Sequence, residues 1–380
     1  MKNIIHALFD ATIMTGEAAV EGHALLVRDG MVVDIVANRA IPAHAHKQNF
    51  LDKILAPGLI DAQVNGGGGV LLNNIPTAKA CLEIAAAHRK FGTTHILPTC
   101  ITDTPDIARQ AIQAVREARK KDASILGIHL EGPHLSPDAK GVHGDPHIRP
   151  MIDDDMNLYR PEAGEIMLIT IAPESVTPQQ IKILRAQGCI VSIGHTKAAP
   201  DQILAALESG ASGFTHLYNA MGGMPARSPG VAGTALDDRD SWCSLIADGH
   251  HVSDAMIRLT LRAKPTGKVF LVSDAMPPSA SDTPQSFQLY GETIRVDNNR
   301  CVNAAGKLAG SAITLIDAVQ YCVKHVGVEL DEALRMASTY PAAFLGCGKT
   351  HGKLLPGYKA DVIMLDHNLT PLRPIFSVFP

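Results

Sequence analysis

The sequence predicts an α/β fold: a closed (β/α)₈ barrel of the TIM type with a small β-sandwich domain formed from both chain termini. Eight strand-like apolar runs follow one another between residues 58 and 273, and amphipathic helical patterns separate most of them. Alternating runs at both ends of the chain predict the small domain. These observations favour a closed barrel over a doubly wound sheet.

Each predicted barrel strand ends in Gly, Asp, His, Asn or Pro or is directly followed by one of them, which is typical of a strand that enters a loop. Several helical patterns begin with Pro, the residue favoured in the first helical turn. The strands are Gly58–Val64, Thr94–Pro98, Ile125–Glu131, Ile166–Ala172, Ile190–Gly194, Gly213–His216, Ser244–Asp248 and Val269–Ser273. The helices are Thr77–Phe91, Pro105–Lys121, Pro178–Gln187, Pro200–Glu208 and Asp254–Arg262, followed by Ser311–His325 and Leu330–Leu345.

The two ends of the chain and one internal segment predict additions to the barrel. Residues 1–56 contain the runs Ile4–Phe9, His23–Val27 and Met31–Val36, with the hairpin signal Asp29-Gly30 between the last two. Together with strand-like Ala360–Leu365, they predict a composite domain of residues 1–56 and 351–380 around a barrel of residues 57–350. The alternating stretch Phe287–Val302, with Asp297-Asn298-Asn299 as its turn, predicts a β-hairpin insertion near residues 285–305.

The composition excludes several classes of partner. The 380 residues carry a net charge of −4 without basic blocks, and only 4% are aromatic, which argues against nucleic acid. No stretch reaches the roughly 18 apolar residues of a membrane span, so we expect no membrane association. The 7 cysteines are odd in number and scattered, without a C-x-x-C pair, and predict a reduced, cytoplasmic protein.

Chemically active side chains follow the predicted strands, whose carboxyl ends meet on one face of a barrel. Two imidazoles and a carboxylate on separate strands, opposite a further acid, suit a catalytic divalent metal with an open position for water. The residues at the strand ends are Asp61, Gln63 and Asn65 after the first, Glu131 after the third, His195 after the fifth, His216 after the sixth, Asp248, His250 and His251 after the seventh, and Asp274 after the eighth.

Each of these signals has a simpler interpretation. His195 and His216 taken singly are compatible with hydrogen-bonded barrel histidines, and Asp274 within SDAMPP with a helix N-cap. The same three ligands would also suit an Fe(II) oxygenase, although that chemistry does not require an opposing carboxylate. Gly66–Gly69 suits a tight loop better than an anion-binding nest, because it lacks the Lys-Ser/Thr of a P-loop.

Two loop residues are open to either reading. His143, in KGVHGDP, follows Glu131 in a Gly- and Pro-rich loop, where a mobile substrate contact and a surface histidine are both compatible with the pattern. Arg227, in MPARSPG, lies in a long loop before the seventh strand, where most arginines are solvated.

A set of motifs in fixed order resembles one family. HLEGPH, IGHT, THLYNAM, ADGHHV and VSDAM, with Asn65-Gly66 upstream and PGYKAD near the end, resemble the N-acetylglucosamine-6-phosphate deacetylases of the amidohydrolase superfamily. The resemblance covers essentially the whole chain. It implies metal-dependent hydrolysis of the acetamide of N-acetyl-D-glucosamine 6-phosphate to D-glucosamine 6-phosphate and acetate, in amino sugar catabolism or cell-wall recycling.

The resemblance also implies a role for individual residues. Glu131, His195 and His216 would hold the metal, Asp274 would act as general base and then general acid, and His143 would polarise the acetamide carbonyl. The sugar phosphate would meet the backbone of Asn219 and Ala220, His251, and Arg227 from the neighbouring subunit. A homodimer, or a higher oligomer, follows from that last contact.

The first strand departs from the pattern of many amidohydrolases, which place His-x-His there for a second metal and a carboxylated Lys after the fourth strand. This chain has Gln63-Val64-Asn65 and Ala172-Pro173-Glu174 instead. Because amides bind Zn²⁺ or Fe²⁺ more weakly than imidazole does, we expect one divalent ion per subunit, Zn²⁺ or Fe²⁺.

The sequence leaves three alternatives open. One is an N-acetylgalactosamine-6-phosphate deacetylase, since the two sugars differ at one hydroxyl group. Another is an amidohydrolase that acts on a cyclic amide or another N-acyl substrate. The third is a catalytically inactive assembly protein of the superfamily, which the presence of Glu131, His195, His216 and Asp274 argues against.

Overall fold

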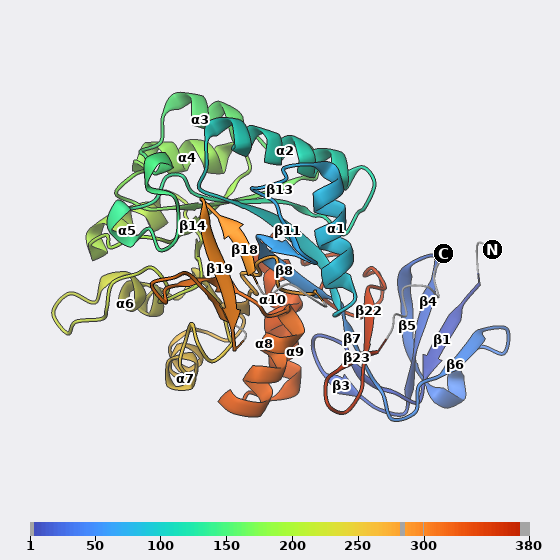
Figure 1. Cartoon of the computed structure of the whole chain (residues 1–380). Coiled ribbons are helices and arrows are strands. Elements are labelled where there is room, and N and C mark those ends of the chain that lie inside the picture. The colour runs from blue at the N-terminus through green and yellow to red at the C-terminus, as the bar shows by residue number, and fades with distance from the viewer. Residues whose placement is uncertain (1–3, 282–285, 299, 373–380) are drawn as a thin grey trace.

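A computed structural model describes residues 4–281, 286–298 and 300–372. Its centre is a sheet of eight parallel strands in the order β17-β16-β15-β14-β13-β12-β11-β8 (Figure 1). A parallel bridge between Val64 and Ala275 joins the first strand to the segment that follows the last, and closes the barrel. The strands are β8 (Leu59–Val64), β11 (Thr93–Ile101), β12 (Gly127–Glu131), β13 (Ile166–Ile171), β14 (Ile190–Ile193), β15 (Gly213–Phe214), β16 (Trp242–Leu245) and β17 (Val269–Leu271). The predicted fold class is confirmed.

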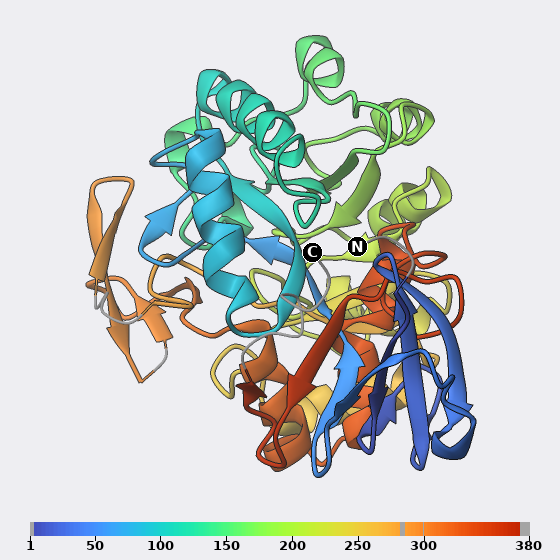
Figure 2. The same cartoon turned by 90° about the vertical axis from the view of Figure 1, so that its right-hand side faces the viewer.

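Helices cover the outside of the barrel (Figures 1 and 2). Thr77, Thr104 and Thr177 cap three of them, because each hydroxyl accepts a hydrogen bond from a backbone amide in the first turn. The helices are α1 (Ala78–Arg89), α2 (Pro105–Arg119), α3 (Asp153–Leu158), α4 (Pro178–Ala186), α5 (Pro200–Glu208), α6 (Gly230–Asp237), α7 (Asp254–Ala263), α8 (Leu315–Tyr321), α9 (Leu330–Ala337) and α10 (Thr339–Phe344).

The last two predicted helices differ from the structure. The first begins at Leu315 rather than Ser311, because Ser311 belongs to a strand, and it continues beyond Tyr321 as a π-helix over Cys322–Val326. The predicted helix Leu330–Leu345 is two helices that meet at Ser338. The backbone of Ser338 leaves the helical region (φ −136°, ψ −69°), while its hydroxyl donates to the carbonyl of Leu334 at 2.6 Å.

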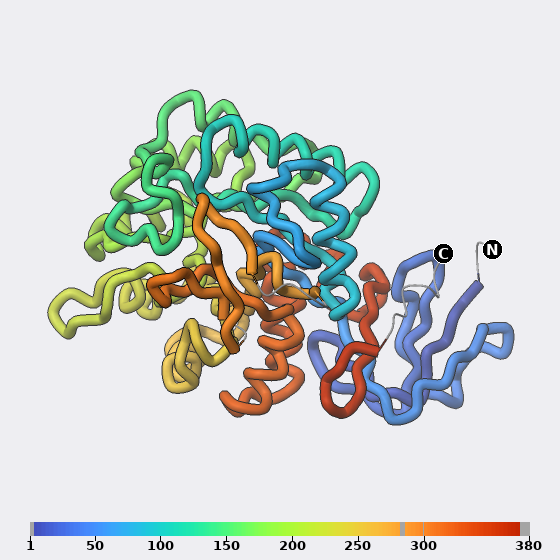
Figure 3. The backbone as a smooth tube through the Cα atoms, in the orientation of Figure 1, coloured from blue at the N-terminus to red at the C-terminus, as the bar shows by residue number. Residues whose placement is uncertain are grey.

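The two ends of the chain form neighbouring sheets beside the barrel, blue and red in Figure 3. One sheet has the order β5-β4-β1-β6 and the other β23-β22-β7-β2-β3. The predicted Asp29-Gly30 turn joins β4 and β5, and both of its residues have positive φ. The strands are β1 (His6–Phe9), β2 (Thr12–Met14), β3 (Ala19–Val20), β4 (His23–Arg28), β5 (Met31–Ala37), β6 (His46–Asn49), β7 (Ile54–Pro57), β22 (Val362–Leu365) and β23 (Pro371–Leu372). The exact domain boundaries stay a prediction.

A small antiparallel sheet stands where the hairpin insertion is predicted, and it projects from the barrel on the side away from the terminal sheets (Figure 2). It has four strands rather than two: β18 (Ser286–Leu289), β19 (Glu292–Asp297), β20 (Arg300–Val302) and β21 (Leu308–Ser311). Asn299 of the predicted turn lies outside the described residues. A two-stranded ribbon, β9 (Gly66–Gly67) and β10 (Val70–Leu71), follows β8.

Within the described part of the chain, no helix is both long enough and apolar enough to cross a membrane.

The core of the terminal sheets gives a prediction about stability. Leu55 on β7 is fully buried among Leu8, Val27 and Val362. Leu55→Ala should lower the free energy of unfolding by about 2–5 kcal/mol, the usual cost of a cavity in a packed core. The matched change Leu51→Ala, at a side chain that is 64% exposed, should cost less than about 0.5 kcal/mol. Urea denaturation measures both, and equal losses would contradict the assignment of this core.

Candidate active site

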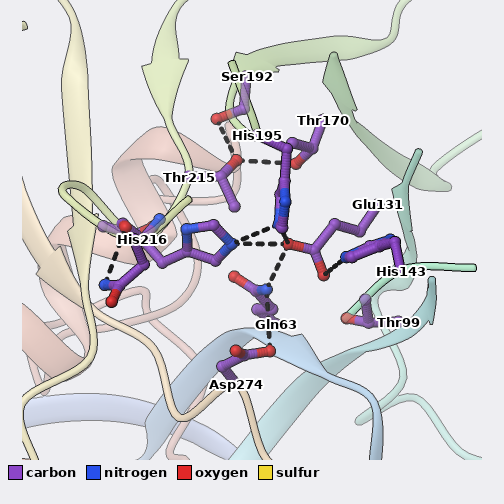
Figure 4. Close-up of polar contacts among 12 residues, drawn as sticks. Gln63, Thr99, Glu131, His143, Thr170, Ser192, His195, Thr215, His216 and Asp274 are labelled. Atoms are coloured by element: carbon purple, nitrogen blue, oxygen red, sulfur yellow. Dashed lines mark hydrogen bonds and ion pairs between the residues drawn. The ribbon is translucent and has the colours of Figure 1, made fainter. Parts of the chain in front are cut away.

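Three side chains from different strands meet at the carboxyl end of the barrel (Figure 4). Glu131 is the last residue of β12, and His195 and His216 lie just beyond β14 and β15. The Oε1 atom of Glu131 lies 3.2 Å from His195 Nε2 and 2.8 Å from His216 Nε2, and the two Nε2 atoms are 3.1 Å apart. All three residues are buried.

The backbone at these positions is strained in the same way. His195, His216 and Asp274 have φ of +48°, +33° and +51°, in the left-handed region that residues other than glycine rarely adopt. Such strain persists only where the surrounding structure holds it, and it clusters at functional sites. The side chains of His195 and His216 point toward Glu131, and that of Asp274 points toward Gln63 (Figure 4).

The hydrogen bonds fit a cation between these three ligands. His195 Nδ1 lies 3.0 Å from the carbonyl of Ala139, and a carbonyl only accepts, so Nδ1 carries the proton and Nε2 is a bare lone pair. That lone pair faces the Glu131 carboxylate, which is also an acceptor. Two acceptors at 3.2 Å need a proton or a metal ion between them. Together with His216 they form a group whose ligating atoms all lie within 4.8 Å of one another.

Electrostatics favour the same arrangement. Burial by itself would raise the pKa of Glu131, but the adjacent imidazoles of His195 and His216 outweigh it and hold that pKa well below the ordinary range. Burial by itself would lower the pKa of His216, but the Glu131 carboxylate raises it above the ordinary value. Glu131 therefore stays ionised and suited to bind a positive charge.

Gln63 links the two carboxylates of the site. Its Nε2 lies 3.0 Å from Glu131 Oε1 and 3.0 Å from Asp274 Oδ1. Because ionised carboxylates only accept hydrogen bonds, the NH₂ end of Gln63 faces both of them, and its carbonyl end is turned away. Gln63 therefore acts as a donor between two acids. That it is not a strong metal ligand stays a prediction.

Asp274 lies beyond β17, where Asn65 Nδ2 donates to its Oδ1 at 2.7 Å. Burial, with the Glu131 carboxylate as the second cause, raises the pKa of Asp274 to about 6. A carboxyl group with a pKa near neutrality can both take up and release a proton. A cation held by Glu131, His195 and His216 would lower this pKa and keep Asp274 ionised as a base.

His143 reaches the site from the loop after β12. Its Nε2 lies 4.0 Å from Glu131 Oε2, and its Nδ1 lies 2.8 Å from the hydroxyl of Thr102. Burial and then the charge of His195 lower the pKa of His143 to about 3, so the ring is neutral. The backbone N–H of Thr102 donates to Nδ1 at 3.4 Å, which assigns the proton to Nε2 and makes that nitrogen a donor.

A pocket of about 130 Å³ opens over these groups. Most predicted substrate contacts line it: His143, Asn219, Ala220 and His251. Asp248 holds His251 in place, since its Oδ2 lies 2.7 Å from His251 Nδ1. Arg227 does not line this pocket and is exposed on its loop. Its predicted reach into a neighbouring subunit stays a prediction.

Other strand-end residues have structural contacts. Asp61 is buried and accepts from the backbone amides of Ser273 and Gln63, so it positions the segments on either side of the barrel closure. His250 is exposed. Glu174, which follows the fourth strand, accepts from the Thr196 hydroxyl and from the Lys197 backbone amide at 3.0 Å.

The glycine run forms the predicted tight loop. A Cβ atom on Gly66 would lie 2.2 Å from the carbonyl oxygen of Val70, and one on Gly67 would lie 2.5 Å from His88 Nε2. Only glycine permits backbone approaches this close.

Several pocket residues were not predicted. Met276, Leu308 and Gly310 form part of the wall, and Thr102 orients His143. Met276 had a signal in the sequence, because it stands in the VSDAM motif two residues beyond Asp274. Leu308 and Gly310 had none, because only the packing of β21 against the barrel brings them there.

An eight-stranded barrel with a group of two histidines and a glutamate at the carboxyl ends of its strands is typical of metal-dependent hydrolases. The profile of the Amidohydrolase family matches residues 54–380, and the chain belongs to this family.

Relatives and solved structures within the family are similar over nearly the whole chain. An N-acetylgalactosamine-6-phosphate deacetylase of Shewanella sp. (strain ANA-3) is 38% identical over 94% of this chain and 91% of its own. An N-acetylglucosamine-6-phosphate deacetylase of Haemophilus influenzae is 31% identical over 96% of both chains.

Among solved structures, the N-acetylglucosamine-6-phosphate deacetylase of Pasteurella multocida superposes with a TM-score of 0.92 at 34% identity, over 97% of both chains. A mutant of the Mycobacterium smegmatis enzyme, in complex with N-acetyl-D-glucosamine-6-phosphate, superposes with a TM-score of 0.89 at 29% identity, again over 97% of both chains.

The donor position of Gln63 gives a prediction. Gln63→Leu removes one hydrogen bond to each carboxylate, and a hydrogen bond to a charged group contributes about 1.5–3 kcal/mol. We expect hydrolase activity (kcat/KM) to fall by roughly ten- to a hundredfold, with metal content unchanged.

Loss of the donor also destabilises the ionised form of Asp274 and raises its pKa, so the acid limb of the pH–rate profile should move to higher pH. The control is Gln113→Leu, an exposed position on α2. Loss of the metal in Gln63→Leu would instead make Gln63 a ligand.

Proposed function

We propose that the protein is a metal-dependent deacetylase that hydrolyses the acetamide of N-acetyl-D-glucosamine 6-phosphate to D-glucosamine 6-phosphate and acetate. One observation carries the proposal: Glu131, His195 and His216 converge on a single point, and Gln63 ties this group to the carboxylate of Asp274. A cation-binding group beside a buried carboxyl group that can take up and release a proton suits hydrolysis of an unactivated amide. The reaction would serve amino sugar catabolism or cell-wall recycling.

The cofactor we propose is one divalent ion per subunit, Zn²⁺ or Fe²⁺, held by Glu131, His195 and His216. When bound, such an ion supplies Lewis acidity, which polarises a carbonyl group and lowers the pKa of water. The donor set of two imidazoles and one carboxylate suits either metal. The orientation of the Gln63 amide supports a mononuclear site, because its carbonyl oxygen is turned away from the group.

The side chains of this chain would handle the proton. Asp274 accepts a proton from the attacking water while the oxygen of that water bonds to the acetamide carbon. His143 Nε2–H donates to the carbonyl oxygen as negative charge develops there. Asp274 then transfers its proton to the nitrogen as the C–N bond breaks, which releases the amine and acetate. Asn65 and Gln63 hold Asp274 in one orientation throughout.

The sugar phosphate would lie at the mouth of the pocket. Asn219, Ala220 and His251 line the pocket there. The backbone of Ala220 has a rarely adopted φ of +52°, and the backbone amide of Asn219 donates to the carbonyl of His216 at 3.0 Å. These residues provide little fixed positive charge for a dianion. We therefore propose that Arg227 of a neighbouring subunit completes the site, and that the protein is a homodimer or a higher oligomer.

N-acetyl-D-galactosamine 6-phosphate is a second candidate substrate. The Shewanella relative, at 38% identity, is named for that sugar, whereas the Haemophilus relative at 31% is named for the glucosamine epimer. Acetate release from both N-acetylhexosamine 6-phosphates, with metal content measured on the same sample, decides between them. Hydrolysis of neither sugar would refute the proposed function.

We propose a cytoplasmic location. In the described structure the seven cysteines are unpaired, and six of them are buried. This suits a reducing compartment.

Asp274→Asn tests the proton transfer. The amide keeps the size of the side chain but cannot accept a proton, so we expect turnover to fall by at least about a thousandfold. Metal content and binding of the phosphorylated sugar should persist. Asp248→Asn is the control. It should hold His251 less firmly in place, and therefore raise KM more than it lowers kcat. Near-normal turnover of Asp274→Asn would refute the role of Asp274.

Arg227→Ala tests the phosphate contact. Loss of a charge-assisted bond to the phosphate should raise KM for the phosphorylated sugar by roughly tenfold or more, with little effect on the unphosphorylated sugar. Arg239→Ala, at another exposed arginine, is the control. A mixture of Arg227→Ala and Asp274→Asn subunits should regain activity only if the arginine acts across the interface. Equal effects on both sugars would remove the phosphate role.

A further inference from the structure

A second group of two histidines and a carboxylate lies at the opposite end of the barrel. His95 is near the amino end of β11, His351 follows α10, and Asp361 immediately precedes β22. The group therefore joins the base of the barrel to the C-terminal segment that enters the terminal sheets. Its three ligating atoms lie within 4.8 Å of one another.

The geometry of this group is close to that of the first. The rings of His95 and His351 lie 4.7 Å apart at an interplanar angle of 85°. Those of His195 and His216 lie 4.9 Å apart at 78°. The carboxylate oxygen Asp361 Oδ2 is 3.8 Å from His95 Nε2.

The position of the protons follows from two threonine hydroxyls. Thr94 Oγ1 lies 3.0 Å from His95 Nδ1 and donates its own hydrogen to the carbonyl of Leu59. Thr350 Oγ1 lies 2.8 Å from His351 Nδ1 and donates to the carbonyl of Cys347. With the one hydrogen of each hydroxyl on a carbonyl, the imidazole donates from Nδ1. Both Nε2 atoms are then bare lone pairs.

These lone pairs and the carboxylate face one another without a donor between them. His351 Nε2 and Asp361 Oδ2 are buried and have no hydrogen-bond partner, and His351 is only 8% exposed. A buried acceptor without a partner costs about 1–3 kcal/mol. These two acceptors and His95 Nε2, on separate segments, define a position for a positive charge.

The surrounding charges agree with a neutral imidazole pair. Burial and then the charge of Lys359 lower the pKa of His95 to about 3. Burial, then His95 and Lys359, lower that of His351 to about 4. Neutral imidazole is the form that binds metals. Lys359 opposes a bound cation. Burial raises the pKa of Asp361, and a cation at this point would keep its carboxyl group ionised. The charge of Arg89 is balanced by Asp122, at 2.5 Å.

We propose that His95, His351 and Asp361 form a second, structural binding site for a divalent cation of the zinc class. Two imidazoles and one carboxylate are a donor set that Zn²⁺ accepts, with a remaining position for water. His351 and Lys359 line a cavity of about 680 Å³ at this end of the barrel, which gives the ion a route of entry. The ion ties β11 to the segment before β22, so it stabilises the fold and takes no part in hydrolysis.

The test counts ions. Full-length protein is stripped with a chelator, reloaded with excess Zn²⁺, desalted and measured by mass spectrometry of the metal. His351→Gln and Asp361→Asn, on different segments, should each hold one Zn²⁺ per chain fewer than the wild-type protein. Because the readout is this difference, it does not depend on how many ions the first group holds, and hence not on the proposed function.

Three further variants sharpen the result. His325→Gln, at an exposed histidine, should leave the count unchanged. The double variant His195→Gln/His216→Gln should keep the ion, and added Zn²⁺ should raise its melting temperature. Lys359→Met should tighten Zn²⁺ binding. Circular dichroism checks the folding of each variant. Equal zinc counts in the wild-type protein, His351→Gln and Asp361→Asn would overturn the proposal. The two imidazoles and the carboxylate would then share a proton in place of a metal ion.

Discussion

The Glu131 carboxylate is the interaction on which the site depends. It is buried at the end of β12 and faces the imidazoles of His195, His216 and His143 and the amide of Gln63. A buried charge without partners would be costly. The barrel supplies partners because its parallel strands all end on the same face, so Glu131 and His216, 85 positions apart in the chain, come within 2.8 Å of each other.

Closure of the barrel adds the second acid to this arrangement. The bridge between Val64 and Ala275 sets β8 beside the segment that follows β17, which places Gln63 and Asn65 against Asp274. Asp61 stabilises the same closure of the barrel, because its carboxylate accepts a hydrogen bond from the backbone amide of Ser273. Burial and the Glu131 carboxylate raise the pKa of Asp274, and the hydrogen bond from Asn65 lowers it. This balance therefore depends on the register of the two terminal barrel strands as much as on Asp274 itself.

Much of the fold and of the site could be predicted from the pattern of the chain. Eight apolar runs marked the barrel strands, and the residues at or directly after their ends included Glu131, His195, His216 and Asp274. The break at Ser338 and the π-helix at Cys322–Val326 could not be predicted, since both interrupt a continuous helical pattern. The contribution of Leu308 and Gly310 to the pocket wall could not be predicted either, because nothing in their local sequence indicates that they pack against the barrel.

Strand periodicity and the identity of the strand-end residues are local properties, and they specified the barrel, its polar face and the family resemblance. The direction in which Gln63 presents its amide, the bare lone pair of His195 and the raised pKa of Asp274 depend on partners from other strands. The same holds for His95, His351 and Asp361, which gave no signal as a group in the sequence. Proton positions and charge states are decided by distances between atoms far apart in the chain, and only the folded structure sets those distances.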